Sequence, residues 1–216
     1  MNKKSVLVLA SGGIDSTVLL KHYLDKGWDV SALLVNHSQP RLTEEYHSFW
    51  GICELLGIDI KVYRVAEFKY DKFFGPVRNA FLLTIAENVA YHMKIPYVAI
   101  GMSLGEYLDT RPEFIDRFNF MLDFCLRKPI YVLAPFAHWS KERVIKYGLK
   151  IDAPLHLTTS CMDSPPCGKC QDCRLRAKYG IDTPVSNSTL RLMSKTLDEG
   201  LVQPWLRKDD KTGANQ

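Results

Sequence analysis

The chain has 216 residues, of which 46% are hydrophobic and 24% charged. This length is sufficient to bury a core and predicts one main domain, with room for a small appendage. The formal net charge of +4 allows an anionic ligand, but the basic residues are scattered and form no arm of the kind that wraps nucleic acid. No apolar run reaches the length of a signal-peptide core or a membrane span, so we expect a cytoplasmic protein without a membrane partner.

Strand and helix patterns alternate along the first 150 residues. Strands are predicted at 6–10, 30–35, 58–65, 97–101 and 130–134, and helices at 16–26, 42–56, 79–93, 112–126 and 140–147, the last with Ser140 as N-cap. Because parallel neighbours need crossover connections, this alternation predicts an α/β fold, a doubly wound parallel sheet with helices on both faces.

In such sheets, ligands bind beyond the carboxyl ends of the strands. This rule gathers four loops at one rim, residues 11–17, 36–41, 66–78 and 102–111, which together form the predicted active site.

The stretch SGGIDST follows the first strand and leads into the first helix. Glycines after a buried strand let the backbone approach an anion, and the free amides of a helix N-terminus can bind it. The candidate phosphate ligands are Ser11, Gly12, Gly13, Asp15, Ser16 and Thr17. Asp15 is placed to hold Mg²⁺ on a bound phosphate, although the helix dipole alone also favours a carboxylate there. The alternative is an ordinary strand-to-helix turn.

No lysine follows these glycines, so the loop fits neither the Walker pattern nor the dinucleotide pattern. It is similar to the SGGxDS pyrophosphate loop (PP-loop) of the ATP-pyrophosphatase group, which includes GMP synthetase, asparagine synthetase and tRNA-thiolating enzymes. The resemblance implies an adenine nucleotide alpha hydrolase-like fold and cleavage between the α and β phosphates of ATP. Such enzymes transfer AMP to a carboxylate or carbonyl oxygen, and a nitrogen or sulfur nucleophile then displaces it.

Four of the six cysteines lie in the stretch SCMDSPPCGKCQDC. They are Cys161, Cys167, Cys170 and Cys173, in the spacing C-x5-C-x2-C-x2-C. Four thiolates at such spacing can close a tetrahedral structural zinc site, and an iron–sulfur cluster or a metal-free segment are the alternatives. We favour zinc, because nothing in the sequence indicates an electron-transfer partner. Cys53 and Cys125 lie in apolar, helix-like contexts and are expected to be core residues.

Together, the SGGIDST loop and the segment SC…PCGKCQDCRLR resemble the 7-cyano-7-deazaguanine synthase (QueC) family of queuosine-precursor biosynthesis. The stretches GPVRNAFLLTIA, TRPEF and WSKERVIKYGLKIDAP resemble family segments in the same order, so the likeness covers about residues 4–180. The resemblance implies an ATP-dependent carbon–nitrogen ligase. In this family, ATP with Mg²⁺ activates 7-carboxy-7-deazaguanine, ammonia forms the amide, and the amide is activated again and dehydrated to the nitrile. A four-cysteine zinc site and a homodimer are also implied.

On this resemblance, residues 1–150 are the ATP-binding domain, 151–180 the zinc segment and 181–216 a C-terminal tail. A carboxylate oxygen is a poor leaving group, so adenylation is needed and a basic residue beside the developing charge would assist it. The expected catalytic residues are Asp15, Ser16 and Arg78. The expected substrate-binding residues are Gln39, Arg78, Asn79, Arg111 and Glu113, each of which has a surface or helix-start role as its alternative. His37 and His138 are candidate acid–base groups or structural histidines.

Three departures from the family pattern fall on the substrate rim. Residues 36–41 read NHSQPR where the family reads DYGQRH, the loop before GPVRN is short, and residues 105–110 replace a longer stretch before RPEF. These differences concern the acceptor more than ATP activation. The alternatives are a relative that passes the adenylated acid to another amine, such as one on a protein, a tRNA-modifying enzyme of the same group, and a non-enzymatic zinc- and nucleotide-binding module.

Overall fold

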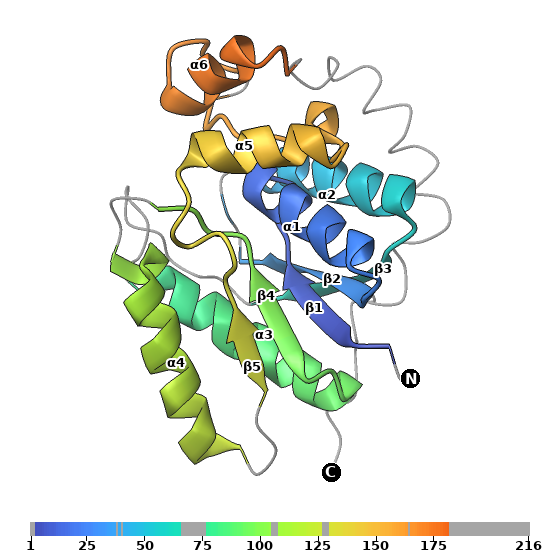
Figure 1. Cartoon of the computed structure of the whole chain (residues 1–216), viewed down its shortest axis with the longest axis vertical. Coiled ribbons are helices and arrows are strands. Elements are labelled where there is room, and N and C mark those ends of the chain that lie inside the picture. The colour runs from blue at the N-terminus through green and yellow to red at the C-terminus, as the bar shows by residue number, and fades with distance from the viewer. Residues whose placement is uncertain are drawn as a thin grey trace, which may run out of the picture. The chain divides into compact units, whose positions relative to one another are not determined.

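Five parallel strands form one sheet, in the order β3-β2-β1-β4-β5 (Figure 1). Their bounds are β1 (Ser5–Leu9), β2 (Asp29–Asn36), β3 (Asp59–Arg64), β4 (Tyr97–Ile100) and β5 (Tyr131–Leu133). The chain leaves β1 first toward β2 and β3, and later returns to add β4 and β5 on the other side of β1. This arrangement confirms the predicted α/β fold and places a topological switch point beside β1.

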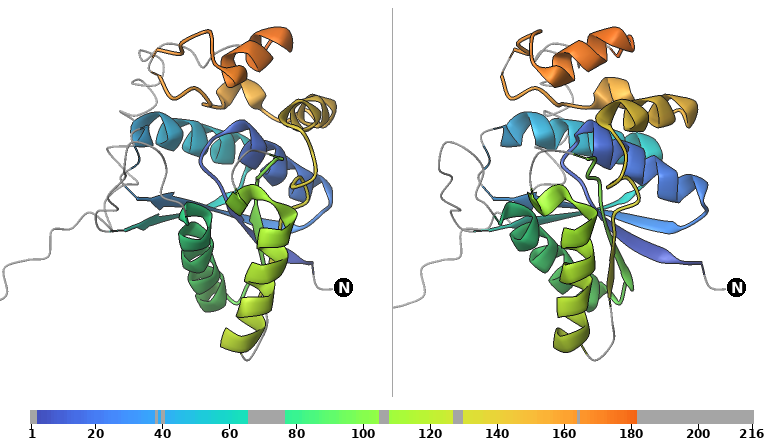
Figure 2. Two further views of the ribbon diagram at one scale, coloured as in Figure 1. Left: turned by 90° about the vertical axis from the view of Figure 1, so that its left-hand side faces the viewer. Right: turned by 60° about the vertical axis from the view of Figure 1, so that its left-hand side comes forward.

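Helices cover both faces of this sheet. They are α1 (Ile14–Asp25), α2 (Leu42–Leu56), α3 (Arg78–Met93), α4 (Pro112–Cys125), α5 (Lys141–Lys150) and α6 (Gln171–Lys178), with short 3₁₀ turns at Leu108–Thr110 and Leu155–Leu157. Helices α1, α2 and α5 lie on one side of the sheet, and α3 and α4 lie on the other (Figure 2). Among the described helices, none combines the length and apolar character needed to cross a bilayer.

The computed structural model describes residues 3–37, 39, 41–65, 77–104, 108–126, 130–163 and 165–181. Most of the predicted rim loop 66–78, residues 105–107 of the next rim loop, and the predicted tail beyond residue 181 lie outside the described residues. All described residues belong to the unit Met1–Pro184.

The element bounds agree with the sequence prediction, with instructive exceptions. Helix α1 begins at Ile14, two residues before the predicted start, because extended backbone at Gly13 leads directly into the first turn. Ser140 is the N-cap of α5, as predicted, and its hydroxyl accepts a hydrogen bond from the backbone N–H of Arg143 at 3.3 Å. The prediction that Cys125 is a core residue is wrong, since this last residue of α4 is exposed.

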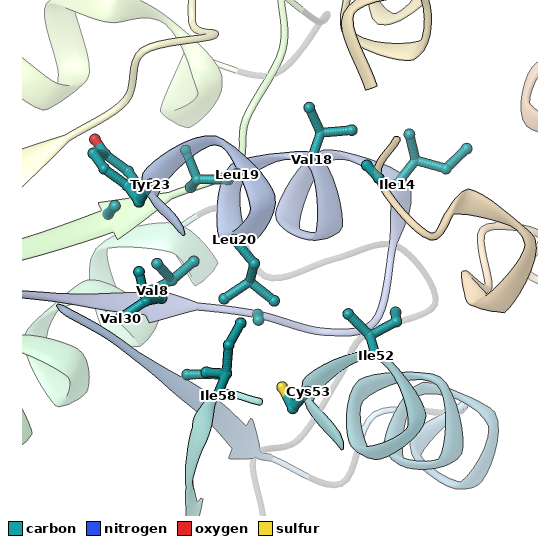
Figure 3. Packing of buried hydrophobic residues seen from close by; sticks show 14 of the residues in the cluster. Val8, Ile14, Val18, Leu19, Leu20, Tyr23, Val30, Ile52, Cys53 and Ile58 are labelled. Atoms are coloured by element: carbon teal, nitrogen blue, oxygen red, sulfur yellow. The ribbon is translucent and has the colours of Figure 1, made fainter. Parts of the chain in front are cut away.

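The core consists of two apolar clusters, one on each face of the sheet. Alternate residues of β1 serve both, because successive side chains of a strand point to opposite faces: Val6 and Val8 face α1, and Leu7 belongs to the cluster under α3. Figure 3 shows Leu20 of α1 pointing toward the strands and the fully buried Cys53 of α2, while Leu19 lies on the opposite side of the same helix. Burial of Cys53 confirms its expected core position.

Two glycines allow close backbone approaches around the start of α1. Gly12 has a left-handed φ of 74°, and a Cβ there would lie 2.7 Å from the backbone nitrogen of Phe49. Gly101 follows β4, and a Cβ there would lie 2.7 Å from the backbone nitrogen of Ser16. The first turn of α1 is therefore held between α2 and the end of β4.

We expect Gly101→Ala to destabilise the protein by about 1–3 kcal/mol, because the added methyl meets backbone atoms that cannot move without shifting α1. Gly51→Ala is the matched control. Gly51 lies inside α2, and a methyl added there would meet no atom within 4 Å, so alanine should stabilise by about 0.5–1 kcal/mol through helix propensity. Urea unfolding of both variants measures the two free energies. Equal effects of the two substitutions would contradict the close approach at Gly101.

The outer edge of β5 is occupied by a side chain of α4. Residues 131 and 133 of β5 face β4, so the backbone groups of Val132 point away from the sheet. The Asn119 amide meets both of them: its Nδ2 donates to the Val132 carbonyl at 3.0 Å, and its Oδ1 accepts from the Val132 N–H at 2.7 Å. The amide thereby satisfies the polar groups that a sixth strand would otherwise use.

Helix α3 carries a buried carboxyl group. Glu87 is 4% exposed, and neither of its carboxyl oxygens has a hydrogen-bond partner among the described residues. Burial raises the pKa of Glu87 to about 7, because desolvation penalises the charged form. The neutral form is therefore compatible with folding, and ionisation opposes it.

Ionisation of Glu87 should make the fold less stable as the pH rises. Its folded pKa lies above the unfolded value, so the protonated group is fully compatible with folding below about pH 4.5, and stability is lost as the pH rises through about 7. Glu87→Gln should therefore be more stable than the parent protein by about 2 kcal/mol at pH 8, with a much smaller difference at pH 5. Urea unfolding at both pH values measures this change, with the exposed Glu54→Gln as control. A pH-independent difference would refute this origin.

Candidate active site

The turn from β1 into α1 presents an uncapped helix N-terminus. Gly13 makes no side-chain cap, and its carbonyl accepts hydrogen bonds from the hydroxyls of Ser16 at 3.1 Å and Thr17 at 2.8 Å. The Ser11 N–H donates to the Ser16 hydroxyl at 3.4 Å, which closes the loop on itself. Such a turn directs first-turn N–H groups outward, and these groups together with the helix dipole suit an anion.

Asp15 projects from this turn and pairs with a lysine that the sequence analysis did not identify. Lys141, the first residue of α5, places its Nζ 2.9 Å from Asp15 Oδ2, and the Ser103 hydroxyl donates to the same oxygen at 3.4 Å. Asp15 Oδ1 is buried and has no hydrogen-bond partner among the described residues. The site therefore combines a cation with a buried carboxylate oxygen that has no hydrogen-bond partner among the described residues.

A cavity of about 380 Å³ lies over this turn at the carboxyl ends of the strands. Its wall includes the phosphate loop, the ends of β2 and β4, the start of α3, and residues 159–162 before the remaining cysteines. Of the predicted site residues, it is lined by Ser11, Gly13, Asp15, Ser16, Gln39, Arg78, Asn79 and Cys161. The structure thus brings the predicted phosphate loop and three of the predicted substrate residues to one cavity.

Polar groups from the β2–α2 connection form one side of the cavity. The Gln39 Nε2 donates to Glu45 Oε2 at 2.8 Å, and its Oε1 accepts from the backbone N–H of His37 at 3.0 Å. Burial raises the pKa of Glu45, an effect that the Gln39 hydrogen bond, Arg78 and Arg41 oppose. Burial, with a smaller contribution from Arg78, lowers the pKa of His37 to about 4, so its imidazole is neutral at pH 7.

Several predicted residues lie away from the cavity wall. Thr17 is fully buried, and Gly12 packs against α2. Arg111 and Glu113, at the start of α4, are exposed and do not line the cavity. His138 is exposed beside a separate cavity of about 320 Å³ between α4 and β5. Asn79 lines the main cavity, but its side chain donates to the Asp109 carbonyl at 3.0 Å.

The four cysteines predicted to bind a metal converge. Their sulfur atoms, from Cys161, Cys167, Cys170 and Cys173, all lie within 4.8 Å of one another. A tetrahedral Zn²⁺ with bonds of about 2.3 Å would space sulfurs about 3.8 Å apart, which this cluster can accommodate. Backbone N–H groups donate to the sulfurs at 3.3–3.4 Å. Such donors, chiefly the backbone of Lys169 and Cys170, lower the pKa of Cys167 to about 7, which favours the thiolate that a metal requires.

The segment that leads to these cysteines contacts the phosphate loop. The Thr159 N–H donates to the Gly12 carbonyl at 3.0 Å, and Arg41 donates through Nη1 to the carbonyls of Cys161 and, at 2.7 Å, Asp163. Arg176 of α6 also binds this segment, donating a hydrogen bond to the Thr158 hydroxyl at 2.7 Å. Figure 1 shows the resulting placement of α6 beside α5.

Sequence reasoning missed Lys141, Glu45 and Arg41. Lys141 could have been found from the sequence. Ligands bind beyond the carboxyl ends of parallel strands, and the loop after the fifth strand leads directly to Ser140 and the start of α5. Glu45 and Arg41 lie within or beside the first turn of α2, next to the predicted rim loop 36–41, but a charged residue at a helix start is ordinarily a surface residue.

The parallel sheet, the uncapped α1 and the cavity at the switch point define a doubly wound α/β protein with a cavity suited to an anionic ligand. The family described as "Queuosine biosynthesis protein QueC" matches residues 5–70 and 59–181. The chain belongs to this family.

Curated relatives agree with this assignment. The chain is 31% identical over 237 residues to a 7-cyano-7-deazaguanine synthase of Leptospira biflexa, and the match covers 87% of this chain and 94% of the relative. It is 30% identical over 210 residues to a 7-cyano-7-deazaguanine synthase of Sulfolobus acidocaldarius, covering 81% of this chain but 45% of the relative. The chain thus spans about half the length of some curated relatives that it matches.

A solved structure supports the fold. A 4-thiouridine synthetase in complex with RNA and bound ATP superposes with a TM-score of 0.50 at 15% identity, over 90% of this chain and 50% of that protein. At this identity the likeness concerns the fold alone.

Proposed function

We propose that this chain is an AMP-forming carbon–nitrogen ligase that uses ATP to convert 7-carboxy-7-deazaguanine and ammonia into 7-cyano-7-deazaguanine. The observation that carries the proposal is the meeting, in one cavity, of the α1 N-terminus, the Asp15–Lys141 pair and the Gln39–Glu45 group. Membership in the QueC family supplies the reaction, and the cavity offers separate polar groups for phosphates and for an organic acid.

The phosphates of ATP would bind at the turn from β1 into α1. Ser11, Gly12, Gly13, Asp15, Ser16 and Thr17 are the proposed ATP-binding residues. The unpartnered Asp15 Oδ1 is a candidate ligand for Mg²⁺, whose preferred ligands are oxygens. Lys141 would supply the ammonium that a Walker lysine provides in other nucleotide loops, and it would do so from α5, the helix that packs against α1.

The acid would bind on the side of the cavity formed by α2 and α3. Gln39, Arg78 and Asn79, which line the cavity, retain their proposed substrate-binding roles, and Arg78 would balance negative charge that develops during adenylation. Glu45 adds an acceptor for the N–H groups of a guanine-type ring. Arg111 and Glu113 stay proposals whose support is the family resemblance, since both lie outside the cavity wall.

Zn²⁺ is the proposed ion of the four-cysteine cluster. A site closed by four thiolates leaves no position for substrate, so its chemistry is structural: it would hold residues 151–180 against the ATP-binding domain of residues 1–150. These boundaries, and a separate tail at 181–216, are proposals as well. We further propose a homodimer in the cytoplasm, where reducing conditions keep metal-binding thiols free of disulfides.

The purified chain, incubated with ATP, Mg²⁺, 7-carboxy-7-deazaguanine and ammonia, should produce AMP, pyrophosphate and the nitrile, identified by mass spectrometry. Omitting ammonia tests the order of events, because AMP should then stay bound to the acid. Production of AMP without amide or nitrile would overturn the proposed acceptor and point to another amine. Absence of ATP turnover would overturn the proposal as a whole.

A further inference from the structure

We infer that the four-cysteine metal site and the nucleotide cavity are thermodynamically coupled through residues 158–163, with Arg41 as the positioning residue that transmits the coupling. This inference rests on the proposed binding of ATP in the cavity. It assigns to the metal site a role beyond holding the chain together.

The linking segment is short and contacts the phosphate loop at one end and the metal site at the other. Thr159 donates its N–H to the Gly12 carbonyl, and Cys161, two residues later, is a member of the sulfur cluster. Residues 159–162 are also part of the cavity wall. Two residues span about 7 Å at most, so a displacement of Cys161 is not absorbed before Thr159.

Arg41 fixes the path of this segment from the other side of the cavity. It is 7% exposed, and its Nη1 reaches the carbonyls of Cys161 and Asp163 while its Nη2 lies 3.3 Å from Glu44. Its Nε is buried and has no hydrogen-bond partner among the described residues, although the side chain lines the cavity. A single guanidinium thus contacts the segment of the first metal-binding cysteine and faces the space where the ligand would lie.

The energetic consequence follows from this shared set of contacts. A metal ion held by Cys161 Sγ would restrain the segment whose carbonyl groups Arg41 binds, and would thereby keep the cavity wall in place for the nucleotide. Ligands that favour the same ordered segment assist each other, and the coupling is reciprocal. Metal occupancy should tighten nucleotide binding, and bound nucleotide should tighten metal binding by the same free energy, which slower metal release would reveal.

The test measures metal release and needs no catalysis. Zn²⁺-loaded full-length protein is mixed with a chromogenic chelator, with and without a saturating ATP analogue that has a methylene between the α and β phosphates. In the parent protein the analogue should slow Zn²⁺ release by about fivefold or more. In Arg41→Met the ratio of the two rates should fall to below about twofold, and Arg41→Lys, which keeps one cationic donor, should recover part of it.

Arg117→Met, a change of an exposed arginine on α4, is the matched control and should behave like the parent protein. Because the analogue is saturating, a direct contact between Arg41 and nucleotide would weaken binding without changing the ratio of release rates. An unchanged ratio in Arg41→Met would therefore overturn the inference. So would equal release rates in the parent protein with and without bound analogue. Calorimetry on the same samples separates these results from failure of the proposed function, which would show as no nucleotide binding at all.

Discussion

Asp15→Asn is expected to reduce AMP formation by on the order of 10²–10³-fold. The substitution keeps the size of the side chain but removes the negative charge that pairs with Lys141 in the wall of the cavity. Without nucleotide, the metal held at the four cysteines should be unchanged, because Asp15 pairs with Lys141 and Ser103 rather than with the cysteine segment. The measurement is the rate of AMP release, with Zn²⁺ content and the thermal midpoint recorded on the same samples.

The matched control is Asp25→Asn, which removes an acid from the other end of α1, where Asp25 pairs with Lys21. A second variant sharpens the test. If Asp15 and Lys141 act as one unit, Asp15→Asn and Lys141→Met combined should lose little more activity than either alone. Full turnover in Asp15→Asn would show that the loop is not a phosphate site. If the activity losses of the two single variants multiply in the double variant, Asp15 and Lys141 act independently.

Cys173→Ser is expected to weaken Zn²⁺ binding by more than about 100-fold, since changes even in residues around metal ligands cost 10–100-fold. Cys173 is buried at 7% exposure on α6, and serine offers no thiolate to complete the tetrahedron. The sheet should stay folded, because both apolar clusters are centred on the strands and on helices α1 to α5. Competition with a chelator of known affinity measures the loss, and far-ultraviolet circular dichroism follows the fold.

Cys125→Ser provides the control for thiol chemistry in general. Cys125 is exposed at the end of α4 and lies outside the sulfur cluster, so its replacement should leave Zn²⁺ affinity unchanged. Equal Zn²⁺ affinity in Cys173→Ser and the parent protein would refute the four-cysteine site.

The sheet and its helices were predictable because each element has a clear hydrophobic period and is bounded by capping or turn residues. Helix α2 begins and ends at the predicted residues, and Gly57 closes it in a left-handed conformation, as its position after the last apolar residue indicated. The start of α1 was placed too late, because the glycines and the aspartate of this stretch are residues typical of turns.

The location of the candidate site was predictable from the sequence, but the contacts between side chains that are distant in sequence were not. Asp15 was identified from local sequence, but its partner Lys141 comes from 126 residues further along the chain. The contact of Arg41 with Cys161 likewise spans 120 residues. Such pairs depend on how helices pack across the rim, and no local period carries that information. Spacing alone predicted the cysteine cluster, because its ligands are close together in sequence.

The amide of Asn119 has a bearing on how copies of this chain associate. By holding both outward backbone groups of Val132, it closes one margin of the sheet against any incoming strand. A partner subunit therefore cannot extend the sheet past β5 without first breaking two hydrogen bonds and leaving a polar side chain unsatisfied. Association through this edge would have to use contacts between side chains. The Asn119 amide blocks formation of a continuous sheet across two subunits at this edge.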